Sequence, residues 1–517
     1  MSDAFAPISA STNDNYFVLI TAVPNLMTVM AFGNKSKSLI TKFDVTPDNA
    51  MAFEEAVENI FDEKCQAIVL HIFNFKPIGY PHVMKFAYEL RVKFSDKRIY
   101  SFFYSGQSLF ISRLLISAKI KSTKNDVIIC IKVRDDQLLI TEYLFTDAGY
   151  KQIREDVITK AVDEPALDLR EKILKETKPK HIVVYAVSME LPIMKKLKKN
   201  VFPEEKIHCL DKSIRKDSIM QTMKISKYVR DRKIIKYHVI SKCAKDYAVC
   251  FQNNDVPIFT ASAGDTLPII KSECAFRDAF DMEVCGFDAD TLKKRVIYTY
   301  YTSKEDCQNR HRSKLDFYVD YESFAVVRNT PVIVDIILEL PIKLDDALER
   351  KIPVIIFCDN YSVICAVKEG DVQYSFLDGW NGIYGHDAAM YVDGLHHFFG
   401  IEAKNMIKEN PSQGFSNLIE MMSVDNLYRY DNPVFINDEN SEPSGQIHRR
   451  ENIVCFYMAK LLEEHFKVIR DETGNKIDEV AFWPVFTEDT FFKERLHLCL
   501  KSFEDIKILF LHFDLPE

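Results

Sequence analysis

One order of short apolar strands and amphipathic helices recurs along the chain, and this repeat constrains the fold more than any other feature. Residues 16–120 read as three strands followed by helix, strand, helix, strand and helix, with Phe53 and Val57 one helical turn apart. Residues 126–229 repeat part of this order, and it starts again near Ile352. Strands that alternate with helices predict α/β sheets.

Residues 236–345 lack this helical spacing and contain short strand-like runs between polar turns, which is typical of a β-sandwich. We predict seven strands here: Tyr247–Phe251, Pro257–Ala261, Met282–Cys285, Arg295–Thr302, Asp316–Val319, Phe324–Val327 and Val332–Leu340.

The length of 517 residues implies several domains, since single cores stop growing at about 250–300 residues. We expect five segments: a flexible tail at 1–14, a first lobe at 15–122, a second lobe at 123–235, a β-sandwich at 236–350 and an incomplete second copy of a first lobe at 351–517.

The overall charge gives no sign of a nucleic-acid partner, because the net charge is −9 and such partners usually need a basic face. The basic runs Lys195–Lys199 and Lys227–Lys236 are short, have acids close by, and read as solvated helix faces or linkers rather than phosphate sites. No window reaches 18 consecutive apolar residues, so we expect no membrane span. The residues also suggest no metal site: His386, His396 and His397 read as packing or surface histidines.

The 12 cysteines are isolated, with no CxxC pair, and the first 14 residues have no basic start or apolar stretch of the signal type. Both features fit a reducing compartment. We therefore expect a cytoplasmic protein, with the nucleus as the alternative.

Glycine is scarce, with 15 among 517 residues, or about 3% against a usual ~7%. Loops that hold phosphates with backbone N–H groups need glycine, because side chains keep the backbone away from the ligand. Neither GxGxxG nor GxxxxGK[ST] occurs. The sequence therefore does not predict a phosphate loop.

Three stretches resemble DnaK-type heat-shock chaperones, the seventy-kilodalton class. Pro353–Val367 is similar to the opening strand-turn-strand of that family, and it is followed by Gly400-Ile-Glu-Ala-Lys-Asn405 and by Glu479–Asp489. The other two stretches are His181–Pro192, which looks like the strand of the adenosine motif, and Thr266–Glu273, which resembles the start of the peptide-binding domain. The resemblance implies actin-like (ribonuclease-H-like) ATPase lobes plus an all-β sandwich in a multidomain chain.

The family holds Mg-ATP between two hairpin turns that read GIDLGTT and DLGGGTFD. In the first turn, the restarted lobe places Ile356 at the acid and Asp359 where a hydroxyl is expected, and the N-terminal copy places Thr21 at the acid. A carboxylate such as that of Asp359, at a position where the family has a hydroxyl, would repel phosphate.

The second turn, which begins here at Ile131, also has no glycine. In the adenosine motif, Ala186 and Val187 replace the paired glycines, while Ser188 is retained. These seven positions form, by resemblance, a vestigial nucleotide cleft, with no catalytic residue, no metal ligand and no cofactor.

We therefore expect a degenerate pseudo-ATPase and not an enzyme, acting on other proteins as a scaffold or on unfolded clients as an ATP-independent holdase. One alternative is a diverged but active ATP-binding folding chaperone, for which ATP and Mg²⁺ are cofactors and Ser188 and Asp359 matter. Another is a structural subunit of a larger assembly. An unpaired lobe would expose its cleft face, so a homo-oligomer is a further expectation. The chain also ends before the last helix of that lobe, which we interpret as a truncated tandem.

Overall fold

The computed structural model describes residues 5–135, 137–252, 255–277, 281–287, 293–302, 309–425, 427, 434, 443–485, 490–501, 503 and 505–511. By its internal contacts the chain divides into two compact units. Unit 1 comprises Met1–Ser272, Phe280–Tyr301 and Asp316–Arg328, and unit 2 comprises Glu273–Ala279, Thr302–Leu315 and Asn329–Glu517.

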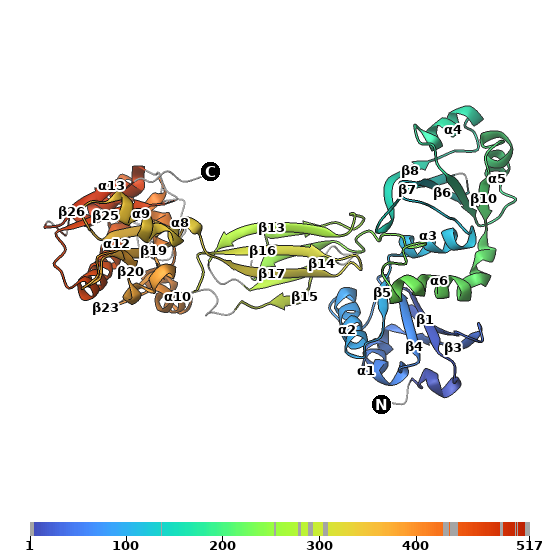
Figure 1. Ribbon diagram of the computed structural model, residues 1–517, viewed down its shortest axis with the longest axis horizontal. Coiled ribbons are helices and arrows are strands. Elements are labelled where there is room, and N and C mark those ends of the chain that lie inside the picture. The colour runs from blue at the N-terminus through green and yellow to red at the C-terminus, as the bar shows by residue number, and fades with distance from the viewer. Residues whose placement is uncertain are drawn as a thin grey trace. The chain divides into compact units, whose positions relative to one another are not determined.

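The first lobe is a five-stranded sheet with the order β3-β2-β1-β4-β5 (Figure 1). Its strands are β1 (Tyr16–Val23), β2 (Leu26–Gly33), β3 (Leu39–Val45), β4 (Cys65–His71) and β5 (Ser101–Phe103). Its helices are α1 (Ala50–Ile60), α2 (Val83–Asp96) and α3 (Gly106–Ser117). The first three strands are antiparallel, and β1, β4 and β5 are parallel.

The second lobe has the same order and directions, β8-β7-β6-β9-β10. Its strands are β6 (Val127–Arg134), β7 (Gln137–Thr146), β8 (Gly149–Ile158), β9 (His181–Ala186) and β10 (Ile207–Leu210). Its helices are α4 (Ala166–Leu174), α5 (Pro192–Lys196) and α6 (Ser218–Arg230).

Helices α3 and α6 pack between the first two sheets. Leu109 of α3 and Ile225 of α6 share a buried cluster with Leu19 of β1, whereas Leu114 of α3 packs against Cys130 of β6. The apolar residues of α3 therefore pack against two sheets. This explains why apolar residues occur on more than one face of the helix.

The third lobe repeats the order again, β20-β19-β18-β25-β26, with β21 added beside β19. Its main strands are β18 (Val354–Cys358), β19 (Tyr361–Ala366), β20 (Ser375–Phe376), β21 (His386–Asp387), β25 (Glu479–Pro484) and β26 (Lys507–Phe510). A small sheet contains β22 (Met390–Asp393), β23 (His396–Phe399) and β24 (Gly414–Phe415). Its helices are α10 (Gly400–Glu409), α11 (Leu418–Ser423), α12 (Pro443–Thr473) and α13 (Thr490–Leu500).

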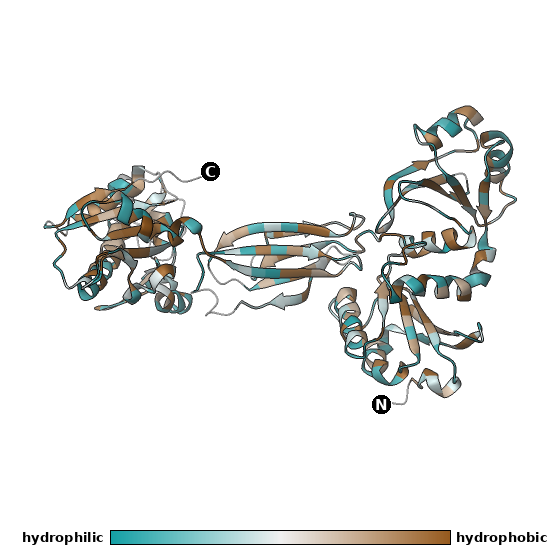
Figure 2. Ribbon diagram, in the orientation of Figure 1, coloured by the Kyte–Doolittle hydropathy of each residue, from teal (hydrophilic) through white to brown (hydrophobic). Residues whose placement is uncertain are grey.

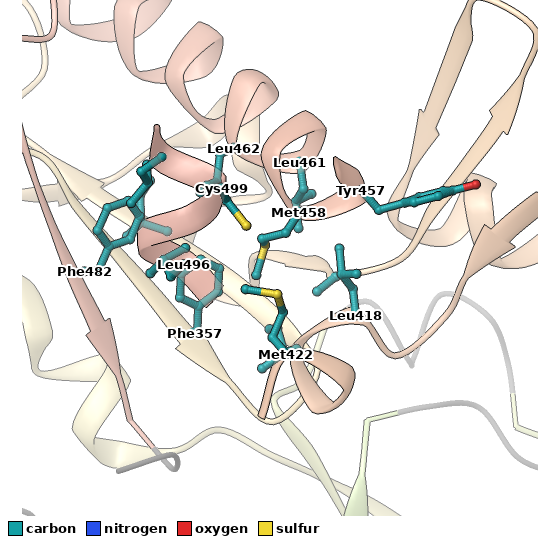
Figure 3. Close-up of a cluster of buried hydrophobic side chains, with 14 of the residues drawn as sticks. Phe357, Leu418, Met422, Tyr457, Met458, Leu461, Leu462, Phe482, Leu496 and Cys499 are labelled. Carbon is teal, nitrogen blue, oxygen red and sulfur yellow. The ribbon is translucent and has the colours of Figure 1, made fainter. Parts of the chain in front are cut away.

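One face of the third sheet is covered by α11, α12 and α13. Figure 3 shows Phe357 of β18 and Phe482 of β25 beside Met458, Leu496 and other apolar side chains of these helices, all of them buried. Hydrophobic residues are likewise concentrated on the strands of the lobes (Figure 2). This burial of apolar surface is the main force that holds each lobe together.

The β-sandwich consists of a four-stranded sheet, β12-β11-β14-β15, and a three-stranded sheet, β13-β16-β17. Its strands are β11 (Tyr247–Phe251), β12 (Pro257–Ala261), β13 (Ile269–Phe276), β14 (Met282–Phe287), β15 (Lys294–Tyr300), β16 (Arg312–Val319) and β17 (Ala325–Val332). The rings of Phe259 and Phe317 stack with centroids 5.7 Å apart and join the two sheets.

The expected fold class is confirmed: the chain is multidomain, with actin-like, ribonuclease-H-like α/β lobes plus an all-β sandwich. The predicted strand Val332–Leu340 is wrong, because most of this segment forms α8 (Asp335–Leu338) and the start of α9 (Leu340–Ala347). Pro341 stands in the first turn of α9, a position that suits a residue without an N–H group.

In the segment expected to be a tail, residues 5–14 are described. Ile8 is buried, and the ring of Phe5 packs 5.6 Å from the rings of Phe43 and Phe53. This part of the segment is therefore packed onto the first lobe.

Candidate functional site: the positions expected to bind nucleotide

Thr21 lies half-buried near the end of β1, between Thr28 of β2 and His71 of β4. The following turn contains Pro24, which has no N–H group to offer a phosphate. The carbonyl of Pro24 instead accepts the backbone N–H of Lys76 at 3.0 Å. The first turn is therefore built for contacts within the lobe.

Ile131 and Ala186 are core residues of the second lobe, 1% and 0% exposed, in one apolar cluster. The neighbour Lys132 faces α3 instead, with its Nζ 5.1 Å from the centroid of the Phe110 ring. Successive residues of a strand point to opposite faces. Lys132 therefore lies on the face of β6 that α3 covers, and its pKa is lowered by burial and by Arg134.

Val187 and Ser188 follow β9 and are exposed. The hydroxyl of Ser188 accepts the backbone N–H of Glu190 at 3.2 Å, a local turn interaction. The structure therefore brings Ile131, Ala186, Val187 and Ser188 to one sheet, whereas Thr21 belongs to another.

The hairpin turn between β6 and β7 stands where the second phosphate loop is expected by resemblance. Arg134 and Asp135 are exposed, Asp135 has a φ of +48°, and the next residue lies outside the described part of the chain. A cavity of about 280 Å³ beside the turn is lined by Lys132, Arg134, Gln107 and Glu155, among others. Gln107 donates to Glu155 at 3.2 Å. Because Lys132, Arg134 and Glu155 all line the cavity, it contains both signs of charge, and no glycine-rich loop lines it.

Ile356 of the third lobe is fully buried on the face of β18 opposite to that shown in Figure 3. It packs with Ile336 and Ile337 of α8 and with Leu340 of α9. The position at which the resemblance implies an acid is thus part of an apolar core.

Asp359 occupies the turn between β18 and β19 with a φ of +42°, and Arg312 holds it through two hydrogen bonds of 2.7 and 2.8 Å. The carboxylate side chain is only 7% exposed. The two parallel bonds of this fork geometry are among the stronger polar contacts in proteins. The carboxylate of Asp359 is therefore already paired with a cation from the same chain.

A second arginine, Arg277, is buried beside this turn. It donates to Asp387 at 2.6 Å and to the Tyr384 carbonyl at 2.5 Å, and it lies 4.5 Å from the centroid of the Tyr361 ring. Lys404 contacts the other oxygen of Asp387 at 3.1 Å. Although burial opposes it, these two cations hold the pKa of Asp387 below its ordinary value.

His311 is the third residue from outside the third sheet that packs beside this turn. Its Nδ1 accepts the Val334 N–H at 2.9 Å, so Nε2 carries the proton and donates to the Ile383 carbonyl at 2.8 Å. Its ring stacks on Tyr361, and burial lowers its pKa, so it is neutral near pH 7. The pairing of Arg277, Arg312 and His311 with the third lobe was missed in the sequence, because no local pattern links residues so far apart in the chain.

The turn from Asp320 to Phe324 between β16 and β17 packs on the first lobe within unit 1. Asp320 accepts Arg91 at 2.7 Å, and Glu322 accepts the backbone N–H of Phe103 at 2.9 Å. Burial, against the opposing influence of Arg91, raises the pKa of Glu322 to about 7. This contact was also absent from the sequence predictions.

Within the described part of the chain, no group of three or more His, Cys, Asp or Glu side chains could hold a metal ion. Nor is any described helix long and apolar enough to cross a membrane.

No family model matches the sequence, and no curated protein matches it either. Solved structures give distant likenesses. They include a Bacteroides thetaiotaomicron protein with an actin-like ATPase fold and unknown function (9% identity, covering 42% of this chain and 99% of that chain, TM-score 0.21). Others are YeaZ from Pseudomonas aeruginosa (10%, 42% and 93%, TM-score 0.22) and the Ppx/GppA family member of Aquifex aeolicus (10%, 43% and 89%, TM-score 0.20). These likenesses concern the fold alone, and the actin-like assignment rests on the strand order shared by the three lobes.

Proposed function

We propose that the chain is a degenerate relative of DnaK-type chaperones that binds proteins, as a scaffold or an ATP-independent holdase, and does not hydrolyse ATP. The observation that carries this proposal is the state of the turn between β18 and β19. Ile356 is in an apolar core there, and Asp359 is bound by Arg312. Both positions serve packing within the chain.

Phosphoryl transfer depends on placing metal ions, phosphate and water in a preorganised polar site. The first two lobes supply neither a glycine-rich loop nor a free acid at the expected positions Thr21 and Ile131. Ser188 is engaged with the amide of Glu190, which also weakens the alternative of an active chaperone.

Protein binding is supported by β13, the edge strand of its sheet. Most of its residues are exposed, and Ile270 and Phe276 are 69% and 61% exposed. An exposed edge strand offers unpaired N–H and C=O groups to an extended peptide, and apolar side chains add contacts. We assign the client-binding surface to this strand.

The test is suppression of aggregation of a heat-denatured model substrate, with and without ATP. We expect the full chain to slow aggregation equally in both conditions, and the double variant Ile270→Asp and Phe276→Asp to lose most of this effect. A matched control, Val372→Asp and Leu395→Asp, changes two residues that are 81% and 95% exposed in the third lobe and should retain it. Suppression that requires ATP would favour an active chaperone, and no suppression at all would favour a structural subunit.

A further inference from the structure

A cavity of about 230 Å³ in unit 1 lies where α6 ends and the chain turns back toward the first lobe. Three lysines line it: Lys224, Lys227 and Lys236. The aromatic rings of Tyr228, Tyr237 and His238 form part of its wall. It shares no lining residue with the cavity at the β6–β7 turn, so it is a separate site.

Within the part of the chain that the structure describes, the three lysines have no acidic partner. No Asp or Glu lines the cavity, and none of the three forms an ion pair within the described residues. The Nζ atoms of Lys224 and Lys236 lie 5.6 and 5.3 Å from the centroid of the Tyr237 ring. Three uncompensated ammonium groups around one hollow, in a chain with a net charge of −9, attract an anion.

The aromatic wall is neutral and held in place. The rings of Tyr228 and His238 stack with centroids 3.6 Å apart, and the Tyr104 hydroxyl lies 3.2 Å from Nδ1 of His238. Burial lowers the pKa of His238 to about 3, so this ring is uncharged near neutral pH. The positive charge of the cavity therefore comes from the lysines, and the rings supply flat apolar surface.

The size of the cavity limits the ligand. Pockets for drug-sized molecules usually measure about 300–1,000 Å³, and this one is smaller. Lysine binds phosphate as a point charge, without the fixed geometry of arginine. A phosphate group with a small flat substituent satisfies the charge, the volume and the aromatic wall together.

We propose that this cavity binds a small phosphomonoester, with Lys224, Lys227 and Lys236 around the phosphate and the rings of Tyr228 and Tyr237 beside the organic group. The site is independent of the proposed protein-binding function. It also gives the basic run Lys227–Lys236 a ligand, where the sequence alone favoured a solvated surface.

The test is calorimetric titration of the full chain with inorganic phosphate and with phenyl phosphate at low ionic strength. We expect both to bind, and phenyl phosphate to bind at least threefold more tightly. The variant Lys224→Gln, Lys227→Gln and Lys236→Gln should weaken both by tenfold or more. The control Lys195→Gln, Lys198→Gln and Lys199→Gln removes the same charge outside the cavity and should change affinity less than twofold.

Three results would overturn the proposal: no binding of either probe, equal weakening in the two triple variants, or sulfate competing as well as phenyl phosphate. Circular dichroism and the melting temperature establish that each variant is folded. If the cavity variant does not fold, Lys236→Gln alone changes an exposed residue and should still weaken phenyl phosphate at least threefold. An unchanged affinity in that variant would count against the site.

Discussion

Ile356 and Asp359 stand three residues apart, at positions where the resemblance to DnaK-type chaperones implies a phosphate turn. Ile356 is surrounded by apolar side chains of α8 and α9, and Asp359 is neutralised by Arg312. A carboxylate at the first position would be buried without a partner, and the carboxylate at the second is not free to order a metal ion.

Placing an acid at position 356 should therefore damage the fold rather than create a site. We expect Ile356→Asp to destabilise the third lobe by about 4 kcal/mol or more, because it buries a charge without a partner. Thermal unfolding measures this change. Ile342→Asp on α9 is the control, since Ile342 is 68% exposed and should cost less than about 0.5 kcal/mol. Equal melting temperatures for the two variants would contradict the apolar environment of Ile356.

Glu322 should make the stability of unit 1 depend on pH. Its pKa in the folded state, about 7, is above the ordinary 4.5, so the folded state favours the neutral carboxyl. This stabilisation, about 3 kcal/mol, is complete below about pH 4.5 and is lost as the pH rises through 7. Glu322→Gln keeps the group neutral, so its melting temperature should rise relative to that of the native chain between pH 5 and pH 8.

The exposed residue Glu58 on α1, in the same unit, provides the control. Glu58→Gln should show a melting temperature whose difference from the native chain stays constant over the same pH range. If Glu322→Gln also gave a constant difference, the carboxyl of Glu322 would not be titrating between these pH values in the folded protein.

The stability of the β18–β19 hairpin depends on the ion pair of Arg312 and Asp359, which the sequence alone does not reveal. Arg312→Ala leaves the buried carboxylate of Asp359 without its partner and should cost about 2–3 kcal/mol. Asp359→Asn should cost less, because asparagine tolerates the positive φ of this turn. Adding Arg312→Ala to Asp359→Asn should then cost much less than Arg312→Ala alone.

Unfolding of the two single variants and the double variant forms a double-mutant cycle. A coupling energy above about 1 kcal/mol is expected for two residues in direct contact. Strictly additive effects would mean that the two hydrogen bonds contribute nothing to stability.

Strong local patterns explain which elements could be predicted. Tyr247–Phe251 and Pro257–Ala261 were predicted with the bounds that the structure has. The run from Val332 to Leu340 reads as a strand in the sequence, because it is apolar and rich in Ile and Val, residues that favour strands. Its short helices form because Ile336, Ile337 and Leu340 lie on one side and cover the third sheet. That contact is tertiary, and no local propensity encodes it.

The three lobes keep one strand order within their sheets. The order of strands and helices along the chain could be predicted, because the central strands are compact apolar runs. The charged contacts of unit 2 were not readable. Arg277 and Asp387 are separated by 110 residues, and Arg312 and Asp359 by 47. Only the fold shows that the expected phosphate turn of the third lobe is filled by side chains of the same chain.

Calorimetric titration with Mg-ATP is the decisive experiment for a protein whose expected nucleotide positions are filled by its own side chains. It should use the variant Lys224→Gln, Lys227→Gln and Lys236→Gln, so that phosphate binding at the lysine cavity does not contribute. We predict no binding up to millimolar nucleotide, in keeping with lobes that retain the actin-like frame without a phosphate site. Micromolar, magnesium-dependent affinity in this variant would contradict the account.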